Sequence, residues 1–391
     1  MDGNTLPSHA DSDRQPIIRT AHVAVDDATP VARLADALGD GPFSLITLFS
    51  APSPEFSALM SAAQSRFRDA TVIGCTTAGE ISAAGYSSNG IVATAFPADH
   101  FASTTLVFDK LHLCESHEMT GDVIRARAAL AQTHGSMAHE FAFLLIDGLS
   151  LKEDIVAASV ASGLGEVQVF GGSAGDGTRF EATYVAVNGQ TLRNAAVLTL
   201  VRTHCPVKVF SLNHFIPTDQ RMVVTSADPL RRIVHTINAE PAAQELARIS
   251  GRDPGQIDTF TFASTPVVVR FGGSHHVRAI KRVTELGYLE FFSAIDEGLV
   301  LTLASAKNMV THLKAQFADL GQGGKPATII ACDCLLRRIE AEQNQMTHAI
   351  SQVLAANNVT GFSTYGEQIN AMHVNQTMTG VAIYPPDRSK P

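Results

Sequence analysis

The chain has 391 residues, of which 45% are hydrophobic and 17% charged, so it is long enough for more than one hydrophobic core. Its net charge of -9 argues against nucleic acid or an acidic membrane surface as the main partner, and no apolar run reaches the roughly 18 residues of a membrane-spanning helix. Five cysteines do not suggest a disulfide framework, so we expect a cytoplasmic protein.

The chain begins with residues 1–18, whose mixture of acids, Ser, Pro and Gly predicts a disordered tail. A buried strand is expected at Ser44–Phe49, followed by a helix that Ser53 caps. The next strand, Thr71–Gly74, enters the loop Gly74–Glu80, which reads GCTTAGE. Parallel α/β sheets bind ligands beyond the carboxyl ends of their strands, so this loop is a candidate site.

The middle of the chain continues the alternation of strands and helices. We expect a hairpin from Gly90–Phe96 and Phe101–Phe108, and a capping box between Ser150 and Glu153 at the start of a later helix. Gly171–Gly177 is rich in glycine but lacks the lysine of a phosphate-binding loop, so a tight turn explains it. The alternation of strands and helices restarts after Leu212. We therefore predict an N-terminal domain at 19–220 and a C-terminal domain at 221–391.

The C-terminal region repeats the order of the first unit. A helix starting at Ser305, a strand at Ala327–Ala331, a long helix at Leu335–Ala355 and a strand at Val359–Phe362 lead into Gly361–Glu367, which reads GFSTYGE. Both loops share the pattern GxxTxGE. The sequence therefore predicts an α/β fold with mixed sheets, in which two related halves arose by internal duplication. A glycine enters the next strand after each loop, Gly90 after nine residues and Gly380 after twelve. We therefore infer that the second repeat has three extra residues, in the segment that contains His373.

Four segments together resemble the FIST family of intracellular sensory proteins. They are VIGCTTAGEI, VFGGSAGDG, CDCLLRRIEAE and GFSTYGEQINAMHVNQTMTGVAI, within residues 40–384. Inside the family the chain looks most like the stand-alone haemoproteins that sense nitric oxide. This resemblance implies an N-terminal and a C-terminal FIST domain, haem b and a signalling partner. The partner would be a sensor histidine kinase, or a diguanylate cyclase or phosphodiesterase, and a homodimer is a further expectation.

A haem iron needs a His, Cys, Met or Tyr side chain from an apolar pocket, and CxxCH is absent, so any haem is noncovalent. His373 is the preferred ligand, with His275 and His276 as alternatives. Arg337 is a candidate for a haem propionate. The remaining candidate cofactor contacts are Thr364, Tyr365, Glu367 and Met372.

Other interpretations stay open from the sequence. His373 could simply form a loop hydrogen bond, and the two loops could bind a metabolite such as an amino acid without haem. A hydrolase would use Cys75 as nucleophile, or Glu80 and Glu367 as acid and base, whereas each glutamate could instead stabilise its own loop. Cys332 and Cys334 could sense oxidation, or pack as buried thiols. The cluster His112, Cys114 and His117 lacks the second half of a zinc site.

Overall fold

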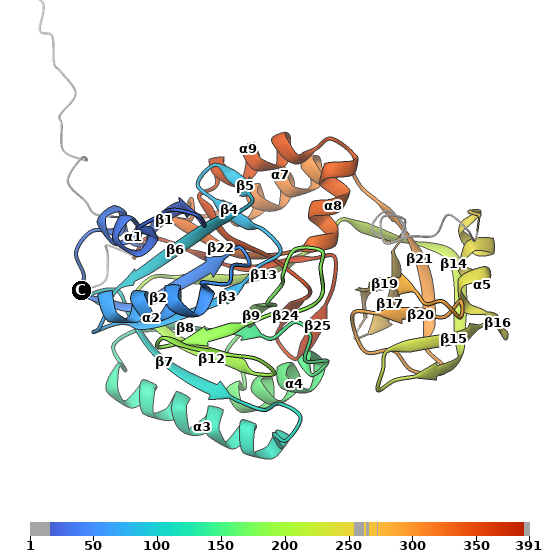
Figure 1. The fold of residues 1–391 in the computed structure, drawn as a ribbon, viewed down its shortest axis with the longest axis horizontal. Helices are drawn as coiled ribbons and strands as arrows, with labels where there is room; N and C mark the ends of the chain where they lie inside the picture. The colour runs from blue at the N-terminus through green and yellow to red at the C-terminus, as the bar shows by residue number, and fades with distance from the viewer. Residues whose placement is uncertain (1–15, 254–261, 263–265, 272, 387–391) are drawn as a thin grey trace, which may run out of the picture.

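The computed structural model describes residues 16–253, 262, 266–271 and 273–386. They form a large body with three six-stranded sheets and a smaller module with one eight-stranded sheet. Figure 1 shows the helices of the body outside its sheets and the smaller module to one side. This mixed α/β architecture confirms the predicted fold class.

The body consists of three copies of one structural unit. In the first copy, a strand and a helix precede a parallel βαβ segment, a short hairpin and a returning strand. Its elements are β1 (Arg19–Ala24), α1 (Pro30–Leu38), β2 (Phe43–Ser50), α2 (Phe56–Arg66), β3 (Thr71–Thr76), β4 (Glu80–Ser82), β5 (Gly85–Ser87) and β6 (Gly90–Pro97).

The second copy follows directly. It comprises β7 (Phe101–Phe108), α3 (Ser116–Thr133), β8 (His139–Ile146), α4 (Glu153–Leu164), β9 (Val169–Ser173), β10 (Val185–Val187), β11 (Gln190–Leu192) and β12 (Ala196–Thr203). The third comprises β13 (Val207–Leu212), α7 (Met309–Leu320), β22 (Thr328–Cys334), α8 (Leu335–Gln343), α9 (Thr347–Ala356), β23 (Val359–Thr364), β24 (Glu367–Ile369), β25 (Met372–Val374) and β26 (Met378–Ile383). The predicted duplication relates the first and third copies, and the structure adds the second.

The smaller module interrupts the third copy between β13 and α7. We call residues 213–308 the insert. Its elements are β14 (Phe215–Asp228), β15 (Ile233–Ile237), β16 (Glu240–Pro241), α5 (Ala242–Ser250), β17 (Val267–Phe271), β18 (Ser274–Arg278), β19 (Ile280–Val283), β20 (Leu289–Phe291) and β21 (Val300–Ala306). It has its own hydrophobic core, which includes Met222, Leu246, Leu289 and Leu301.

The three copies exchange their hairpins in a cycle. The β4–β5 hairpin of the first copy extends the third sheet by pairing with β23, and the β24–β25 hairpin of the third copy pairs with β9. The β10–β11 hairpin of the second copy completes the cycle by pairing with β3. Each sheet therefore contains strands of two copies, and the body has approximate threefold symmetry.

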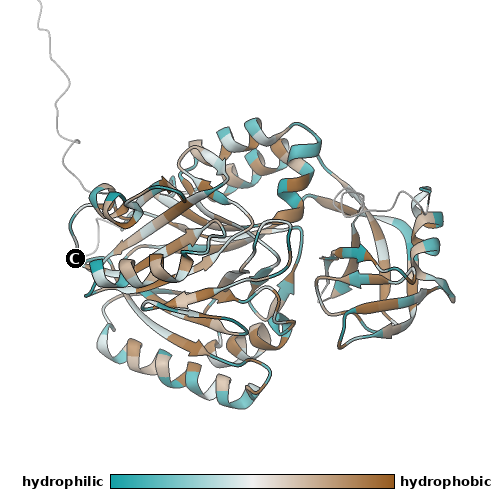
Figure 2. Ribbon diagram, in the orientation of Figure 1, coloured by the Kyte–Doolittle hydropathy of each residue, from teal (hydrophilic) through white to brown (hydrophobic). Residues whose placement is uncertain are grey.

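The inner faces of the three sheets share one hydrophobic core. At its centre the ring of Phe49 stacks on Phe362, with centroids 4.4 Å apart, and Phe143 stacks on Phe170 at 4.7 Å. These rings come from β2, β23, β8 and β9, so all three copies contribute. Figure 2 shows hydrophobic residues concentrated along the strands of the body, as burial between three sheets requires.

Three predicted elements and two predicted helix caps were wrong. The N-cap residues of α2 and α4 are Glu55 and Lys152, without a side-chain cap hydrogen bond, in place of Ser53 and Ser150. Strands β6 and β7 do not form a hairpin, because β6 pairs with β1 and β2 whereas β7 starts the second copy and pairs with β12. The long helix at Leu335–Ala355 is two helices, since Gln345 adopts a positive φ of 56° between them. The helix expected from Ser305 begins at Met309, where the Asn308 side chain accepts a hydrogen bond from the Thr311 N–H.

The predicted boundary between residues 220 and 221 falls inside β14. The third sheet combines β4 and β13 from one side of this boundary with β22, β23 and β26 from the other. The two predicted domains thus share a sheet, because the hairpins are exchanged. Most of the predicted disordered tail lies outside the described residues, and β1 begins at Arg19.

Candidate functional site

The loops that follow β3, β9 and β23 meet at one end of the body. The Ala78 N–H donates to the Ser363 carbonyl at 2.9 Å, and the Gly175 N–H donates to the Thr76 carbonyl at 2.9 Å. The Tyr365 N–H closes the cycle on the Ser173 carbonyl at 3.2 Å. We call residues 76–80, 173–183 and 363–367 the loop ring. It brings the two predicted GxxTxGE loops together with the glycine-rich loop of the second copy.

The two glutamates of the repeated motif make equivalent contacts. Glu80 accepts hydrogen bonds from the Thr77 hydroxyl at 2.6 Å and the Gly90 N–H at 3.0 Å. Glu367 accepts from the Thr364 hydroxyl, and from the N–H and hydroxyl of Thr377 at 3.2 and 2.8 Å. Burial raises the pKa of both carboxyl groups, that of Glu367 to about 8. Each glutamate closes its own loop, which favours the structural role over acid–base chemistry.

The sequence alignment of the two repeats was wrong near His373. Glu80 and Glu367 each bind the backbone N–H of the residue ten positions later. The third copy therefore has no insertion here, and His373 matches Tyr86 of the first copy. The error arose because Gly380 corresponds to Ala93, as the pairing of β6 with β2 and of β26 with β22 shows.

His373 is enclosed, with 2% of its surface exposed. Its Nδ1 lies 3.2 Å from Gln368 Nε2, which donates to the Ser173 hydroxyl at 2.9 Å. A Cβ added to Gly366 would lie 2.2 Å from His373 Cε1. Burial lowers the pKa of His373, and the nearby carboxylates of Glu153 and Asp154 oppose this shift. The imidazole of β25 is therefore enclosed between β24 and the loop ring.

Tyr365 links two loops of the ring. Its hydroxyl donates to the Asp176 carboxylate, which also accepts the N–H groups of Phe180, Glu181 and Ala182 at 2.8 to 2.9 Å. Burial acts to raise the pKa of Asp176, but these donors lower it overall. Asp176 is a structural residue of the ring that the sequence analysis missed, although it lies in the glycine-rich loop that was identified.

Arg337 is fully engaged inside the body. Its Nε donates to Asp333 at 2.7 Å, and its Nη1 lies 2.9 Å from His214 Nδ1. His214 belongs to the first of the two chain crossings that connect the insert, and its Nε2 lies 3.0 Å from the Glu340 carboxylate. The Lys307 N–H of the second crossing donates to the His214 carbonyl at 2.7 Å. Arg337 thus anchors the base of the insert.

The insert docks on the loop ring and on the start of α4. Arg232 forms an ion pair with Glu153 at 2.7 Å and reaches Asp154 at 3.3 Å. The ring of Phe292 lies 5.7 Å from that of Phe180, which itself packs against Tyr365. Arg278 Nη1 donates to the His373 carbonyl at 3.3 Å. We call these contacts the docking contact. No local sequence pattern predicts this contact, because its hydrogen-bonded partners are 78 to 95 positions apart.

The remaining candidates are not part of the loop ring. His275 and His276 are neighbours on β18, so one faces each side of the insert sheet. Met372 is half-buried beside the central core. Burial raises the pKa of Cys75, Cys332 and Cys334, as expected of packed thiols. Within the described residues no group of three or more His, Cys, Asp or Glu side chains is arranged to hold a metal ion.

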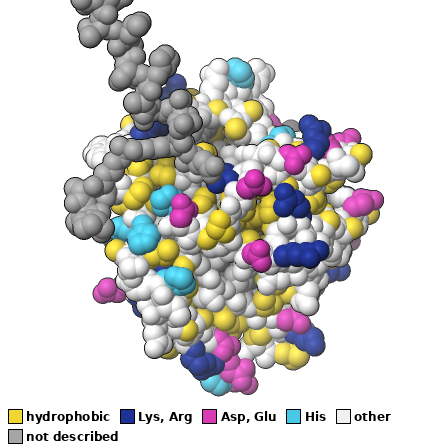
Figure 3. All heavy atoms as spheres, turned by 90° about the vertical axis from the view of Figure 1, so that its left-hand side faces the viewer, with side chains coloured by type: hydrophobic (Ala, Val, Ile, Leu, Met, Phe, Trp, Pro, Cys, Tyr) yellow, Lys and Arg dark blue, Asp and Glu magenta, His cyan; other side chains and the backbone are white. Residues whose placement is uncertain are grey.

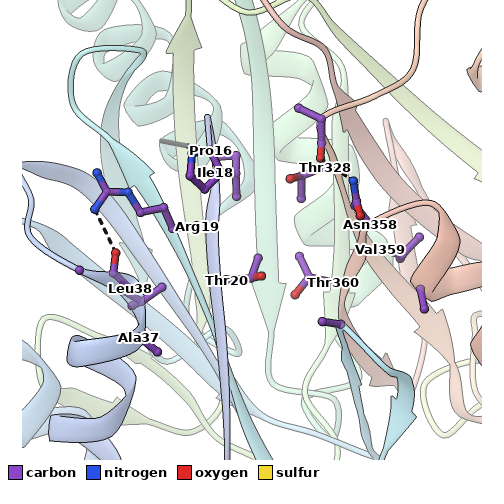
Figure 4. Close-up of a pocket in the computed structure, with 14 residues that line it drawn as sticks. Pro16, Ile18, Arg19, Thr20, Ala37, Leu38, Thr328, Asn358, Val359 and Thr360 are labelled. Atoms are coloured by element: carbon purple, nitrogen blue, oxygen red, sulfur yellow. Dashed lines mark hydrogen bonds between the residues drawn. The ribbon is translucent and has the colours of Figure 1, made fainter. Parts of the chain in front are cut away.

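The body carries a cavity of about 530 Å³ at the seam between β1 and the pair β22–β23 (Figure 4). At the corresponding seams, β7 contacts β2 and β3, and β13 contacts β8 and β9. Small apolar side chains and threonines line the cavity, and the Arg19 guanidinium is held by the carbonyls of Leu38 and Asp40. Figure 3, which views the body from the side opposite the insert, shows charges of both signs interspersed.

The fold and the docking contact define an α/β protein in which a β-module is docked on a threefold body. The family model of the FIST N domain matches residues 44–240, and that of the FIST C domain matches residues 242–370. The chain therefore belongs to the FIST family and has the FIST N and FIST C domains of a sensory protein. No curated protein matches the chain. No helix in the described ranges is long and apolar enough to cross a membrane.

The residues expected around haem do not fit that group in this conformation. His373 presents its Cε1–Nε2 edge to the Gly366 backbone, which leaves no space for a porphyrin. The polar atoms of Thr364, Tyr365 and Glu367 are directed to partners within the body, and Arg337 binds Asp333 and His214. The six predicted side chains therefore do not surround a common space.

Proposed function

We propose that this FIST protein is a sensor in which a bound ligand changes how the insert docks on the loop ring. The observation that carries the proposal is the docking contact, where a buried ion pair between Arg232 and Glu153 joins a module connected by two chain crossings. Contacts of this polar kind between domains resemble transient interfaces, so relative motion is the default expectation.

The base of the insert supports coupling to the body. His214 and Lys307, one from each crossing, are tied together and then to Arg337 and Glu340 of α8. α8 follows β22, whose neighbour β23 leads into the loop ring. A change at the docking contact therefore has a short covalent and hydrogen-bonded route into the body. The sensory output would pass to a separate partner, such as a histidine kinase or a cyclic-di-GMP enzyme.

The distance between insert and body tests this proposal. Cys114→Ser removes the half-buried thiol, and Glu118→Cys on α3 with Glu285→Cys on the insert adds two exposed labelling sites. Spin labels should give one narrow distance distribution, which Arg232→Gln broadens. Arg282→Gln, which breaks the exposed pair with Glu290, is the matched control and should leave the distribution narrow. An unchanged distribution in Arg232→Gln would refute the docking role of this ion pair.

The narrower function, a haem-dependent sensor of nitric oxide, rests on the family resemblance, while the packing of His373 counts against it in this conformation. The ultraviolet-visible spectrum of the protein shows whether it binds haem. A haem protein should show a Soret band that shifts with nitric oxide, and His373→Ala should weaken the band. If no Soret band forms after reconstitution with haem, the remaining hypothesis is a haem-free sensor of a metabolite. In that case a metabolite, but not haem, should raise the melting temperature of the protein.

A further inference from the structure

A second cavity, of about 560 Å³, opens on the insert and is lined by no residue of the loop ring. It is lined by the bulged part of β14, by β17 and β18, and by the start of β21. The pairing of β14 with β21 jumps from Pro217–Ala304 to Arg221–Thr302, so the segment Thr218–Gln220 bulges out of the sheet. Bulges of this kind often lie next to binding sites because they redirect side chains.

The strand registers place three basic side chains on one face of this sheet. Arg270 pairs with His275 across β17 and β18. Thr302 of β21 pairs with both Val268 of β17 and Arg221 of β14. Since side chains alternate between faces, Arg270 lies on the same face as Val268, and hence as Arg221. At about 4.8 Å between strands and 3.3 Å per residue, the two arginine Cα atoms are roughly 12 Å apart.

Three other arginines of the insert have an acidic partner, which Arg221 and Arg270 lack within the described residues. Arg232, Arg248 and Arg282 each form an ion pair. Within the described ranges, neither the Arg221 nor the Arg270 guanidinium has a hydrogen bond or ion pair, although both residues line the cavity. Among the described residues that line the cavity, Asp219 is the single carboxylate, against two guanidinium groups and His275. The cavity therefore carries an excess of positive charge.

Beside the charged groups and Thr302, this face carries several valines. Val300 is 45% exposed at the cavity, Val223 beside it is 38% exposed, and Val268 and Val277 form a small buried cluster under it. A volume of this size is typical of sites for small molecules, which combine apolar walls with a few placed charges. Guanidinium groups match carboxylates and phosphates through paired hydrogen bonds.

We propose that this cavity binds a small organic anion, with an apolar body over the valines and a carboxylate or phosphate group held between Arg221 and Arg270. The site lies on β14 and β21, the two strands that connect the insert to the body. A ligand there would bridge the strands that enter and leave the module. This site is separate from the docking contact and does not depend on the proposed sensory function.

Isothermal titration of the full chain at low ionic strength tests the site. The probes are benzoate and phenyl phosphate, with benzamide as the neutral analogue and inorganic phosphate as an anion without an apolar body. We expect saturable binding of benzoate or phenyl phosphate, at least tenfold weaker binding of inorganic phosphate, and none of benzamide. The stronger of the two aromatic anions identifies the preferred head group.

Arg221→Gln and Arg270→Gln should each weaken binding of the aromatic anion at least tenfold, whereas Arg282→Gln should change it less than twofold. All three arginines are exposed, so the variants are expected to fold. Binding of benzamide equal to that of benzoate would overturn the proposal, as would an equal loss in Arg282→Gln. The absence of saturable anion binding would also overturn it, while leaving the spin-label test of the docking contact unaffected.

Discussion

The charged groups of the body and those of the insert differ in how they are bonded. In the body, buried carboxylates such as Glu80, Glu367 and Asp176 are held by several donors of their own loops. In the insert, Arg232 reaches out to the body, and Arg221 and Arg270 face a cavity without an acidic partner. Buried polar groups that are fully bonded make a rigid frame, whereas cations without partners are available for a ligand. The contrast places the frame in the body and the responsive surface on the insert.

The largest expected effect concerns the glycines of the frame. Gly74, Gly171 and Gly361 occupy equivalent positions, and a Cβ on each would lie 2.4, 2.1 and 1.8 Å from a carbonyl oxygen of the adjacent strand. Gly361 also has a φ of 151°. Gly361→Ala should lower the free energy of unfolding by about 4 kcal/mol or more, and urea denaturation measures it. Gly135→Ala, where the nearest atom is at 3.3 Å, is the control. Equal stability of both variants would contradict the rigid frame.

The next effect concerns the docking contact. Arg232→Met leaves the Glu153 carboxylate buried without its cation and should weaken docking by about 3 kcal/mol. Denaturation should then show a separate, earlier transition for the insert. Because replacing both partners by apolar groups removes the unpaired charge, Arg232→Met with Glu153→Met should recover part of the loss. A double variant as weak as the single one would mean that the ion pair is not the cause.

The pH dependence of stability tests the buried carboxyl group of the frame. Burial raises the pKa of Glu367 to about 8, above about 4.3 in the unfolded chain. Between these two pH values the folded protein binds more protons than the unfolded chain. The contribution of Glu367 to the free energy of unfolding is therefore complete at low pH and is lost as the pH rises toward 8, by about 1 kcal/mol per pH unit. Glu367→Gln should remove this slope. Urea denaturation from pH 5 to 8 measures the difference, and parallel curves would contradict it.

The smallest effect is expected on the open face of the insert. Arg221 and Arg270 are exposed and have no ion pair within the described ranges, so replacing either by Gln should change the free energy of unfolding by no more than about 0.5 kcal/mol. Thermal denaturation without ligand measures this. A larger loss of unfolding free energy in either variant would mean that the arginine has a structural role, which would contradict the difference between insert and body.

Much of the fold followed from local pattern. Apolar runs such as Ser44–Phe49 and Val359–Phe362 are strands in the structure, and the shared GxxTxGE pattern revealed a true repeat. The second copy escaped notice because Val185 stands where the others have Glu80 and Glu367, after a longer loop. The strand exchange could not be predicted, since local sequence does not specify which of three similar edges a short hairpin joins.

The candidate site was harder to predict than the fold. The sequence identified the loops that meet in the ring, but it assigned Arg337 and Glu367 to a ligand although the structure directs both to internal partners. Arg232, His214 and Asp176 act through partners distant in sequence. Such contacts depend on how segments distant in sequence pack together, which no periodicity or motif records.

The exchange of hairpins also has a consequence for how the protein is made. Ile81 of β4 pairs with Gly361 of β23, so these partners are 280 residues apart along the chain. At roughly 5–20 residues per second, the ribosome supplies the partner of β4 about 15 to 55 s after β4 itself. During that time β4 and β5 have no sheet to join. The first copy therefore cannot reach its final pairing alone, and the body closes when the third copy has been synthesised.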